Sequence, residues 1–316
     1  MDIRGEYKLF KESIYSLKFN RMNQIRYYNF WTTQLAKEIW FTKFIEHHGL
    51  LKNYKGKVNF YSVLGTTQSL RKRKHGVNIF FSGENMLADR FNEYKHVCDE
   101  KPFDFSMGFE YSENQNYLRF PLWIMTLFDP TADFEDIKKR VKQLSDFKPD
   151  ERTGFCSLVA SHDWNGIRGQ MIKQLSVIGD VSSGGKFRNN TDDLNVLYDN
   201  NKFDFVRQYK FNICPENSNA LGYVTEKIFQ AIEAGSIPIY WGADNNPEPD
   251  ILNKNAIIFW DINDDNKNSI KQIETLFENK NEYIDYISQP RLKTGAEDII
   301  WNYYTNLQHH FKTLFQ

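Results

Sequence analysis

The stretch of residues 211–242 is the most informative part of the sequence for ligand binding. It reads FNICPENSNALGYVTEKIFQAIEAGSIPIYWG, which predicts a strand, a polar loop, the start of a helix and a further strand. In open α/β sheets, ligands bind in the loops at the carboxyl ends of parallel strands. The N–H groups and the dipole at a helix N-terminus favour an anion such as a diphosphate. A nucleotide site is therefore one interpretation of this stretch, and an ordinary helix start is the other.

Within that stretch, the side chains near the helix start match the groups of a nucleotide. Lys227 adds a positive charge for a phosphate, and Glu226 can accept hydrogen bonds from ribose hydroxyls. Tyr223 and Thr225 open the same predicted helix, and Asn217 supplies a polar group in the loop. Because Glu and Lys are also common in an ordinary first helical turn, these residue types leave both interpretations open.

A second candidate anion site combines residues 161–168, SHDWNGIR, with residues 182–185, SSGG. The first segment opens a predicted helix, so Arg168 lies in the first turn, where it can bind a phosphate through two parallel hydrogen bonds. Ser183 and Gly184 lie in the second segment, whose glycines would let the backbone approach a ligand, although such loops are commonly simple turns. Two helix N-termini, each with a cation, together predict a diphosphate.

In the first half of the chain, Glu84 is the carboxylate best placed for proton transfer. It follows the apolar strand predicted over residues 77–82, VNIFFS, so it lies at the carboxyl end of a strand. A carboxylate there can act as a general base on a hydroxyl. Glu110, in GFEY, is the competing candidate. For both residues the alternative is a carboxylate that only completes the hydrogen bonds of a turn.

Alternating strands and helices must position these residues, which predicts an α/β fold with parallel sheets. Short apolar runs predict strands over residues 24–30, 57–64, 77–82, 155–160, 209–214, 236–241 and 256–260. Helices are predicted over residues 32–48, 166–177 and 223–234, within 133–152, and in the tail from residue 267. Gly235 stands where the C-cap glycine of the helix 223–234 belongs.

Length and composition indicate a globular protein of two domains. With 316 residues, 41% of them hydrophobic, the chain can bury a large core. The charge-rich segment 133–152 contains Pro149 and predicts a helix followed by a linker. We therefore predict an N-terminal domain over residues 1–150, a C-terminal domain over residues 151–292 and a helical tail over residues 293–316.

Charge, cysteine content and motifs exclude several classes of protein. The 40 basic and 41 acidic residues give a net charge of −1, without the basic excess of a nucleic-acid binder. The three cysteines favour a reducing compartment over a disulfide framework, and no run of ~18 apolar residues predicts a membrane span. The sequence has no HExxH, Walker A, GxSxG or Asp-x-Asp motif, so a metal-bridged nucleotide site is not indicated.

Several blocks of the sequence together resemble the α-1,3/1,4-fucosyltransferase family. The stretch CPENSNALGYVTEKIFQAIEAGSIPIYWG resembles its signature, and FFSGEN, GFEYSENQNYLRFPLW and the spaced IR and SSGG elements resemble its other blocks, in the family's order. The resemblance extends from about residue 24 to about residue 290. It implies a GT-B architecture, which is an α/β fold with two Rossmann-like domains facing a cleft. The C-terminal domain would bind most of the donor, GDP-L-fucose.

The resemblance also implies the reaction. The family transfers fucose with inversion at the anomeric carbon, and it makes α-1,3 or, as an alternative, α-1,4 linkages. The acceptor is usually the GlcNAc of a lactosamine-type glycan, held toward the N-terminal domain, and the GT-B architecture usually works without an essential metal. The rival interpretations are another GT-B transferase with a different nucleotide sugar and a catalytically silent glycan-binding module.

Carried over residue by residue, the resemblance assigns roles in this reaction. Glu84 of FFSGEN matches the general base. Arg168 and Lys227 match the residues that hold the diphosphate, and Glu226 matches the residue on the ribose. The further donor contacts fall on Asn217 and Tyr223.

The sequence departs from the family's pattern in two respects. Pro215 stands where many relatives have Phe before Glu-Asn. The chain also lacks the heptad repeats and basic amphipathic tail of some bacterial relatives, and the N-terminal anchor of Golgi relatives. These differences predict a cytoplasmic bacterial enzyme or a chain trimmed at its ends, with peripheral attachment at the inner face of the membrane as the alternative location.

Overall fold

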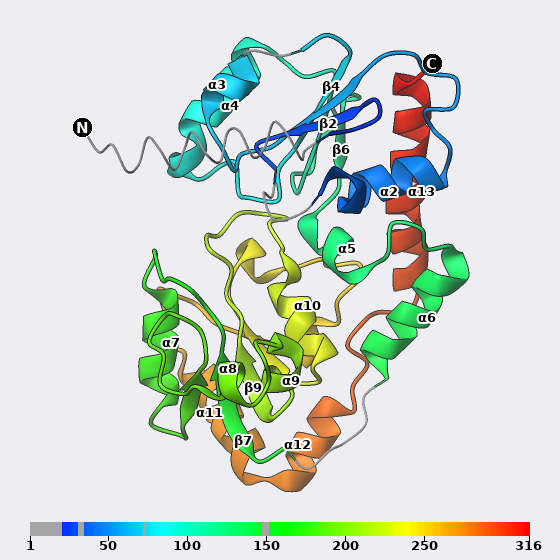
Figure 1. The fold of residues 1–316 in the computed structure, drawn as a ribbon. Coiled ribbons are helices and arrows are strands. Elements are labelled where there is room, and N and C mark those ends of the chain that lie inside the picture. Colours follow the sequence, from blue (N-terminus) through cyan, green and yellow to red (C-terminus); the bar gives the residue numbers. More distant parts are fainter. Residues whose placement is uncertain (1–20, 31–34, 72–73, 147–151) are drawn as a thin grey trace, which may run out of the picture. The chain divides into compact units, whose positions relative to one another are not determined.

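The computed structural model describes residues 21–30, 35–71, 74–146 and 152–316. The chain divides into two compact units, each built on a sheet of mainly parallel strands (Figure 1). Unit 1 comprises Met1–Asp133 and Trp301–Gln316, and unit 2 comprises Phe134–Ile300. The parallel α/β class predicted from the alternation of strands and helices is confirmed.

The sheet of unit 1 has the strand order β1-β2-β3-β4-β5-β6. β1 pairs antiparallel with β2, and the other neighbouring strands pair in parallel. The strands are β1 (Arg21–Met22), β2 (Ile25–Tyr28), β3 (Val58–Tyr61), β4 (Val77–Phe81), β5 (Phe105–Gly108) and β6 (Tyr117–Arg119). The strands predicted over residues 24–30, 57–64 and 77–82 are confirmed as β2, β3 and β4.

Helices cover both faces of this sheet. They are α2 (Trp40–His47), α3 (Thr67–Arg71), α4 (Asn92–Glu100), α5 (Leu122–Leu127) and part of α13 (Ala296–Leu314). Side chains alternate across a strand. Phe60 and Phe81 therefore contact Phe41 of α2 on one face, with ring centroids 5.2 Å apart in each pair. Tyr61 and Phe80 point to the other face, into a cluster with side chains of α3 and α4.

The sheet of unit 2 has the order β11-β10-β9-β7-β8 and is parallel throughout. Its strands are β7 (Gly154–Leu158), β8 (Val181–Ser183), β9 (Tyr209–Ile213), β10 (Ile237–Tyr240) and β11 (Ile258–Phe259). Its helices are α6 (Phe134–Ser145), α7 (Ile167–Leu175), α8 (Asp193–Val196), α9 (Lys202–Val206), α10 (Glu226–Glu233), α11 (Lys267–Glu278) and α12 (Lys280–Ile287). All four strands predicted for this half are confirmed, and β8 is the additional one.

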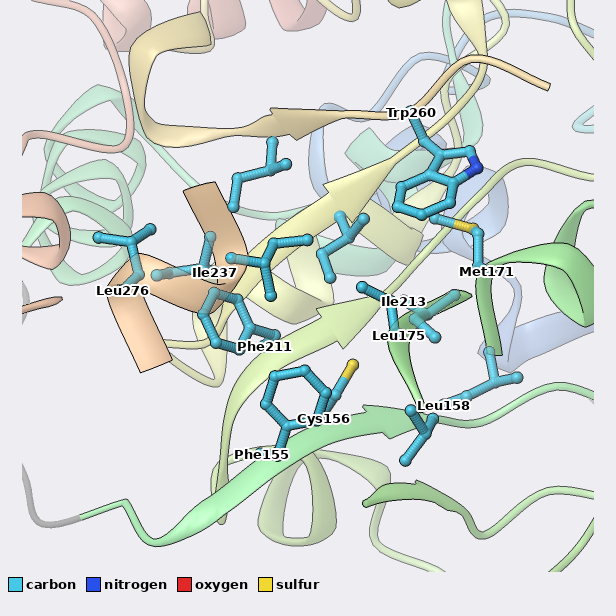
Figure 2. Close-up of a cluster of buried hydrophobic side chains, with 14 of the residues drawn as sticks. Phe155, Cys156, Leu158, Met171, Leu175, Phe211, Ile213, Ile237, Trp260 and Leu276 are labelled. Atoms are coloured by element: carbon cyan, nitrogen blue, oxygen red, sulfur yellow. The ribbon is translucent and has the colours of Figure 1, made fainter. Parts of the chain in front are cut away.

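A buried apolar cluster joins this sheet to the helices α7, α11 and α12. Figure 2 shows Met171 and Leu175 of α7 near Ile213 of β9, and Phe155 near Phe211 on the adjacent strand. All five side chains are buried. Because close-packed side chains of this kind resist displacement, the carboxyl ends of the strands give the following loops a fixed base.

The helix α6 belongs to unit 2, although the sequence predicted the domain boundary later, at residue 150. Arg140 of α6 forms an ion pair with Glu233 of α10, with 2.5 Å between Nη2 and Oε1. The predicted boundary itself falls in residues 147–151, outside the described residues. The contacts of α6 place the division of the chain at Asp133 instead.

The C-terminal residues do not form a separate tail, because α13 packs onto unit 1 from Trp301 onward. The Tyr304 hydroxyl donates a hydrogen bond to the Asp129 carbonyl at 2.7 Å. The Phe311 ring lies 6.1 Å from that of Phe60 and 6.4 Å from that of Phe41. Neither α13 nor any other helix of the described ranges is long and apolar enough to cross a membrane.

Candidate functional site

The centre of the candidate nucleotide site is the loop 214–225 and the first turn of α10, in unit 2. Thr225 is the extended N-cap of α10, with φ −109° and ψ −170°, so the helix begins at Glu226. It therefore starts about one turn later than the predicted helix 223–234. Gly235 follows the helix with a φ of +77°, which confirms the predicted C-cap glycine.

Glu216 is a fully buried carboxylate within this loop. Its Oε1 accepts a hydrogen bond from the Thr225 N–H at 2.7 Å, and its Oε2 accepts one from the Thr225 hydroxyl at 2.7 Å. Oε2 also forms an ion pair with Lys227 Nζ at 3.0 Å. A buried charge is tolerated when it is paired and hydrogen-bonded, and Glu216 meets both conditions.

Lys227 is held by two acceptors and retains one N–H for a ligand. Its Nζ donates to Glu216 Oε2 and, at 2.8 Å, to Thr225 Oγ1. An ammonium has three donors, so one N–H has no acceptor among the described residues. Burial alone would lower the pKa of Lys227, but the carboxylates of Glu216 and Glu226 outweigh it, and the pKa is raised. Lys227 is thus a charged and oriented donor beside the N-terminus of α10.

Arg168 joins the loop after β7 to the loop after β9. The residue is 3% exposed. Its Nη1 donates to the His162 carbonyl at 2.7 Å, and its Nη2 donates to Asn217 Oδ1 at 2.9 Å and to the Pro215 carbonyl at 3.3 Å. Three of the five N–H bonds of the guanidinium are therefore used within the protein. The structure brings Arg168 and Asn217 together, and their contact with a nucleotide stays a prediction.

The N-terminus of α7 is already capped by the protein, contrary to the prediction that it faces a diphosphate. Asp163 accepts the Arg168 N–H through Oδ1 at 3.1 Å and the Gly169 N–H through Oδ2 at 2.8 Å. Asn165 Oδ1 accepts the Ile167 N–H at 3.2 Å. Because side chains of the preceding loop satisfy these donors, the positive end of α7 meets a protein carboxylate. The prediction of an anion at a helix N-terminus therefore rests on α10.

The remaining predicted donor contacts lie at or just before the start of α10. Glu226 is half-buried, and its side chain forms no hydrogen bond with another described residue. Tyr223, which the sequence predicted to contact the donor, is buried and therefore not freely accessible to a ligand. Burial lowers the pKa of Lys202 in α9. The nearby charge of Glu226 acts in the opposite direction but is the smaller influence. The Nζ of Lys202 donates to Gln230 Oε1 at 2.7 Å.

The glycines of the SSGG segment are explained by packing. Ser183 is buried, and its N–H and hydroxyl both form hydrogen bonds within the loop that follows β8. A Cβ on Gly184 would lie 2.9 Å from Leu194 Cβ. A Cβ on Gly185 would lie 2.3 Å from the Ala160 carbonyl oxygen. The close approach that these glycines allow is therefore to the protein's own chain.

Unit 1 carries the two candidate bases at the carboxyl ends of neighbouring strands. Glu84 follows β4, and its Oε2 forms an ion pair with Arg90 Nη2 at 2.5 Å. Its Oε1 has no partner among the described residues. Glu110 follows β5 and is half-buried, and burial raises its pKa despite the opposing charge of Lys95. Because β4 and β5 are parallel neighbours, both residues follow strands that end on the same side of the sheet of unit 1, at the carboxyl ends of the strands.

Three residues that shape the site in unit 2 were not singled out from the sequence. Asp163 lies three residues before Gly166, the N-cap of α7, so the rule that places Asp at the N-cap does not identify it. Glu216 lies within the polar run PENSN. A glutamate in a polar segment is expected to be exposed, so the sequence does not indicate that this one is buried. Lys202 begins a short helix of five residues, for which the sequence offers no periodic signal.

Two family models match the chain in succession. The model of the "Alpha-(1,3)-fucosyltransferase FucT N-terminal domain" matches residues 25–126. The model of "Glycosyltransferase family 10 (fucosyltransferase) C-term" matches residues 149–304. The first range includes Glu84 and Glu110, and the second includes the loop 214–225.

Relatives in several organisms align with parts of the chain. The "Alpha-(1,3)-fucosyltransferase FucT" of Helicobacter pylori is 32% identical over 261 residues, which are 74% of this chain and 51% of that protein. The "GDP-fucose protein O-fucosyltransferase 3" of Gallus gallus is 26% identical over 163 residues, which are 47% of this chain and 34% of that protein. The chain thus spans about half the length of the first of these relatives and about a third of the second.

Solved structures of α1,3-fucosyltransferase share the fold. One with GDP-fucose is 25% identical, with a TM-score of 0.52, and the match covers 81% of this chain and 79% of that chain. Another is 23% identical, with a TM-score of 0.58, and covers 90% of this chain and 89% of that chain. The predicted GT-B fold class, α/β with two Rossmann-like domains, is confirmed by this likeness and by the two parallel sheets.

The packing explanation of the SSGG segment predicts that Gly185→Ala lowers stability. The added Cβ would meet backbone atoms of Ala160, which lies two residues after β7 and accepts a hydrogen bond from the Phe187 N–H. We expect the free energy of unfolding, measured by urea denaturation, to fall by about 1–3 kcal/mol. Gly184→Ala should cost less, because its Cβ would meet side chains. If Gly185→Ala kept wild-type stability and lost only nucleotide affinity, the segment would be a ligand contact after all.

Proposed function

The chain belongs to glycosyltransferase family 10, the fucosyltransferases, and from this premise we propose that it transfers L-fucose from GDP-β-L-fucose to a glycan hydroxyl. The acceptor we propose is a GlcNAc residue of a lactosamine-type glycan, with an α-1,3 linkage and α-1,4 as the alternative. The observation that carries the donor half of this proposal is Lys227. It is charged, oriented by two hydrogen bonds and placed at a helix N-terminus, and its third N–H has no acceptor among the residues that the structure describes.

The proposed mechanism is a single displacement. Glu84 accepts the proton of the acceptor hydroxyl, whose oxygen forms a bond to the anomeric carbon of fucose as the bond to GDP breaks. The anomeric centre is inverted, and GDP departs with increased negative charge on its diphosphate. Lys227, Arg168 and the N-terminus of α10 stabilise that charge, so they act more strongly in the transition state than in the ground state.

We propose that no divalent metal is essential for this reaction. The charge on the leaving diphosphate must be stabilised, either by a metal or by protein groups. The ammonium of Lys227 and the guanidinium of Arg168 are two protein cations on adjoining loops, and the first has a donor available. These groups support a division of labour in which the protein supplies the positive charge.

Two alternatives concern the substrates. Another GT-B transferase would use a different nucleotide sugar with the same phosphate-binding groups. The relatives named "GDP-fucose protein O-fucosyltransferase 3" favour a second acceptor class, a hydroxyl of a polypeptide, with the same donor. A catalytically silent glycan-binding module would have no need for an oriented cation beside a helix N-terminus.

The direct test measures GDP release from GDP-fucose with a panel of acceptors in the presence of excess EDTA. We expect release that depends on a GlcNAc-containing oligosaccharide and retains most of its rate in EDTA. GDP-mannose and a UDP-sugar serve as comparison donors. Faster turnover of a comparison donor would contradict the assignment of fucose, and transfer only to peptides would move the acceptor to the second class. Complete loss in EDTA, restored by manganese or magnesium, would contradict metal independence.

Glu84→Gln tests the general base. The amide keeps the shape of the side chain but accepts no proton at neutral pH, so turnover should fall by about 10²–10⁴-fold. GDP affinity, measured by calorimetry, should stay near that of the wild type, since the residue acts on the acceptor. Glu110→Gln is the matched control. Wild-type turnover in Glu84→Gln, with loss in Glu110→Gln, would transfer the role to Glu110.

Lys227→Ala and Arg168→Ala test the diphosphate contacts. Loss of a hydrogen bond to a charged group should raise the dissociation constant for GDP about tenfold in each variant. The rate with GDP-fucose should fall as well, because the charge to be stabilised grows in the transition state. Lys173→Ala, at an exposed position of α7, is the control for loss of a lysine in unit 2. Unchanged GDP affinity in both variants would mean that the nucleotide binds elsewhere.

A further inference from the structure

We propose that Glu216 is a positioning residue for the donor diphosphate, acting through Lys227. This inference rests on the proposed function, because it assigns to a buried residue the task of orienting the cation that binds the leaving group. Glu216 does not itself face the ligand, since it is fully buried. It would act by fixing two of the three N–H directions available to Lys227, one of them directly and one through Thr225.

Glu216 is fixed from three sides. Its N–H donates to the Trp241 carbonyl at 2.8 Å, which ties the loop after β9 to the end of β10. A Cβ on Gly242 would lie 2.8 Å from Glu216 Cγ, so only a glycine leaves room for this side chain. The φ of Gly242 is +140°, which other residues rarely adopt. The carboxylate on the third side is bonded to Thr225 and Lys227.

The directions of these hydrogen bonds follow from the chemistry of the groups. An ionised carboxylate only accepts and an ammonium only donates. The single hydrogen of the Thr225 hydroxyl therefore points to Glu216 Oε2, at 2.7 Å, and its lone pair receives a hydrogen of Lys227 Nζ, at 2.8 Å. With Nζ also donating to Oε2 at 3.0 Å, the three groups form a closed ring in which each bond supports the others.

This ring prepares Lys227 for an anion. A free lysine side chain would lose conformational freedom when a ligand immobilises it, and that loss weakens binding. Here the ordering is completed during folding, because Glu216 and Thr225 hold the ammonium in the absence of a ligand. The third N–H then projects from a fixed point beside the N-terminus of α10, where the helix dipole also favours negative charge.

The competing explanation is that Glu216 only closes the loop after β9. Both explanations predict a loss of stability when the residue is changed. They differ in the coupling to Lys227. A positioning role requires that Glu216 contributes to GDP affinity only while Lys227 is present, whereas a loop-closing role makes the two contributions independent.

The experiment is a double-mutant cycle of GDP affinity, measured by calorimetry well below the unfolding temperature. In Glu216→Gln the amide presents N–H groups toward Lys227, so the ring is broken and the dissociation constant for GDP should rise about tenfold. In the Lys227→Met background the same change should alter it by less than about twofold. Ser236→Ala is the control, because the Ser236 hydroxyl is buried within hydrogen-bond distance of two backbone carbonyls, at the end of β10 opposite the site. It should lower stability without changing GDP affinity.

Thr225→Val provides a second test that does not depend on the folding of Glu216→Gln. Valine keeps the shape of threonine but removes the hydroxyl that links Glu216 to Lys227, so GDP affinity should fall, and Thr225→Ser should recover most of it. Additive effects in the cycle, or unchanged GDP affinity in Thr225→Val, would overturn the positioning role alone. A wild-type protein that does not bind GDP would overturn the proposed function together with this inference.

Discussion

The buried pairing of Glu216 with Lys227 is the interaction on which the site in unit 2 depends. It brings one negative and one positive group to the point where β9, β10 and α10 converge. Such a pair is costly to form and more costly to break, because either partner left alone would be an uncompensated charge. The surrounding residues are constrained accordingly. Gly242 leaves space for the Cβ and Cγ of Glu216, and Thr225 supplies both a backbone and a side-chain donor.

The two helix starts in this unit show how similar sequence patterns can have different uses. At α7, Asp163 satisfies the backbone donors, and the guanidinium of Arg168 turns back to link two loops. At α10, the carboxylate of Glu216 binds the N-cap and the lysine, and no side chain of the described residues caps the backbone N–H groups of Glu226 and Lys227. One helix start is therefore capped by the protein's own side chains, and the other is where we propose that the diphosphate binds.

Strong local sequence patterns made most of the strands and helices predictable. The features that the sequence did not predict depend on contacts between residues far apart in the chain. The apolar runs that became β7, β9 and β10 and the glycine after α10 are signals contained in a few neighbouring residues. The burial of Glu216, by contrast, results from contacts with Trp241 and Thr225, which no local pattern reveals. The same holds for α13, whose assignment to unit 1 depends on rings more than 200 residues earlier in the chain, such as Phe41 and Phe60. In the SSGG segment the glycines were recognised, but the sequence could not show that Ala160 is what approaches them.

The return of α13 to unit 1 has a consequence for biosynthesis. The ribosome produces unit 1 first, yet the last helix of that unit is made only after the whole of unit 2. The face of the sheet that carries Phe60 therefore lacks Phe311 until α13 has been synthesised, while every contact within Phe134–Ile300 can already form. The unit begun first is thus the unit completed last. Until then its incomplete aromatic face is the surface on which a nascent chain of this protein would most need protection by a chaperone.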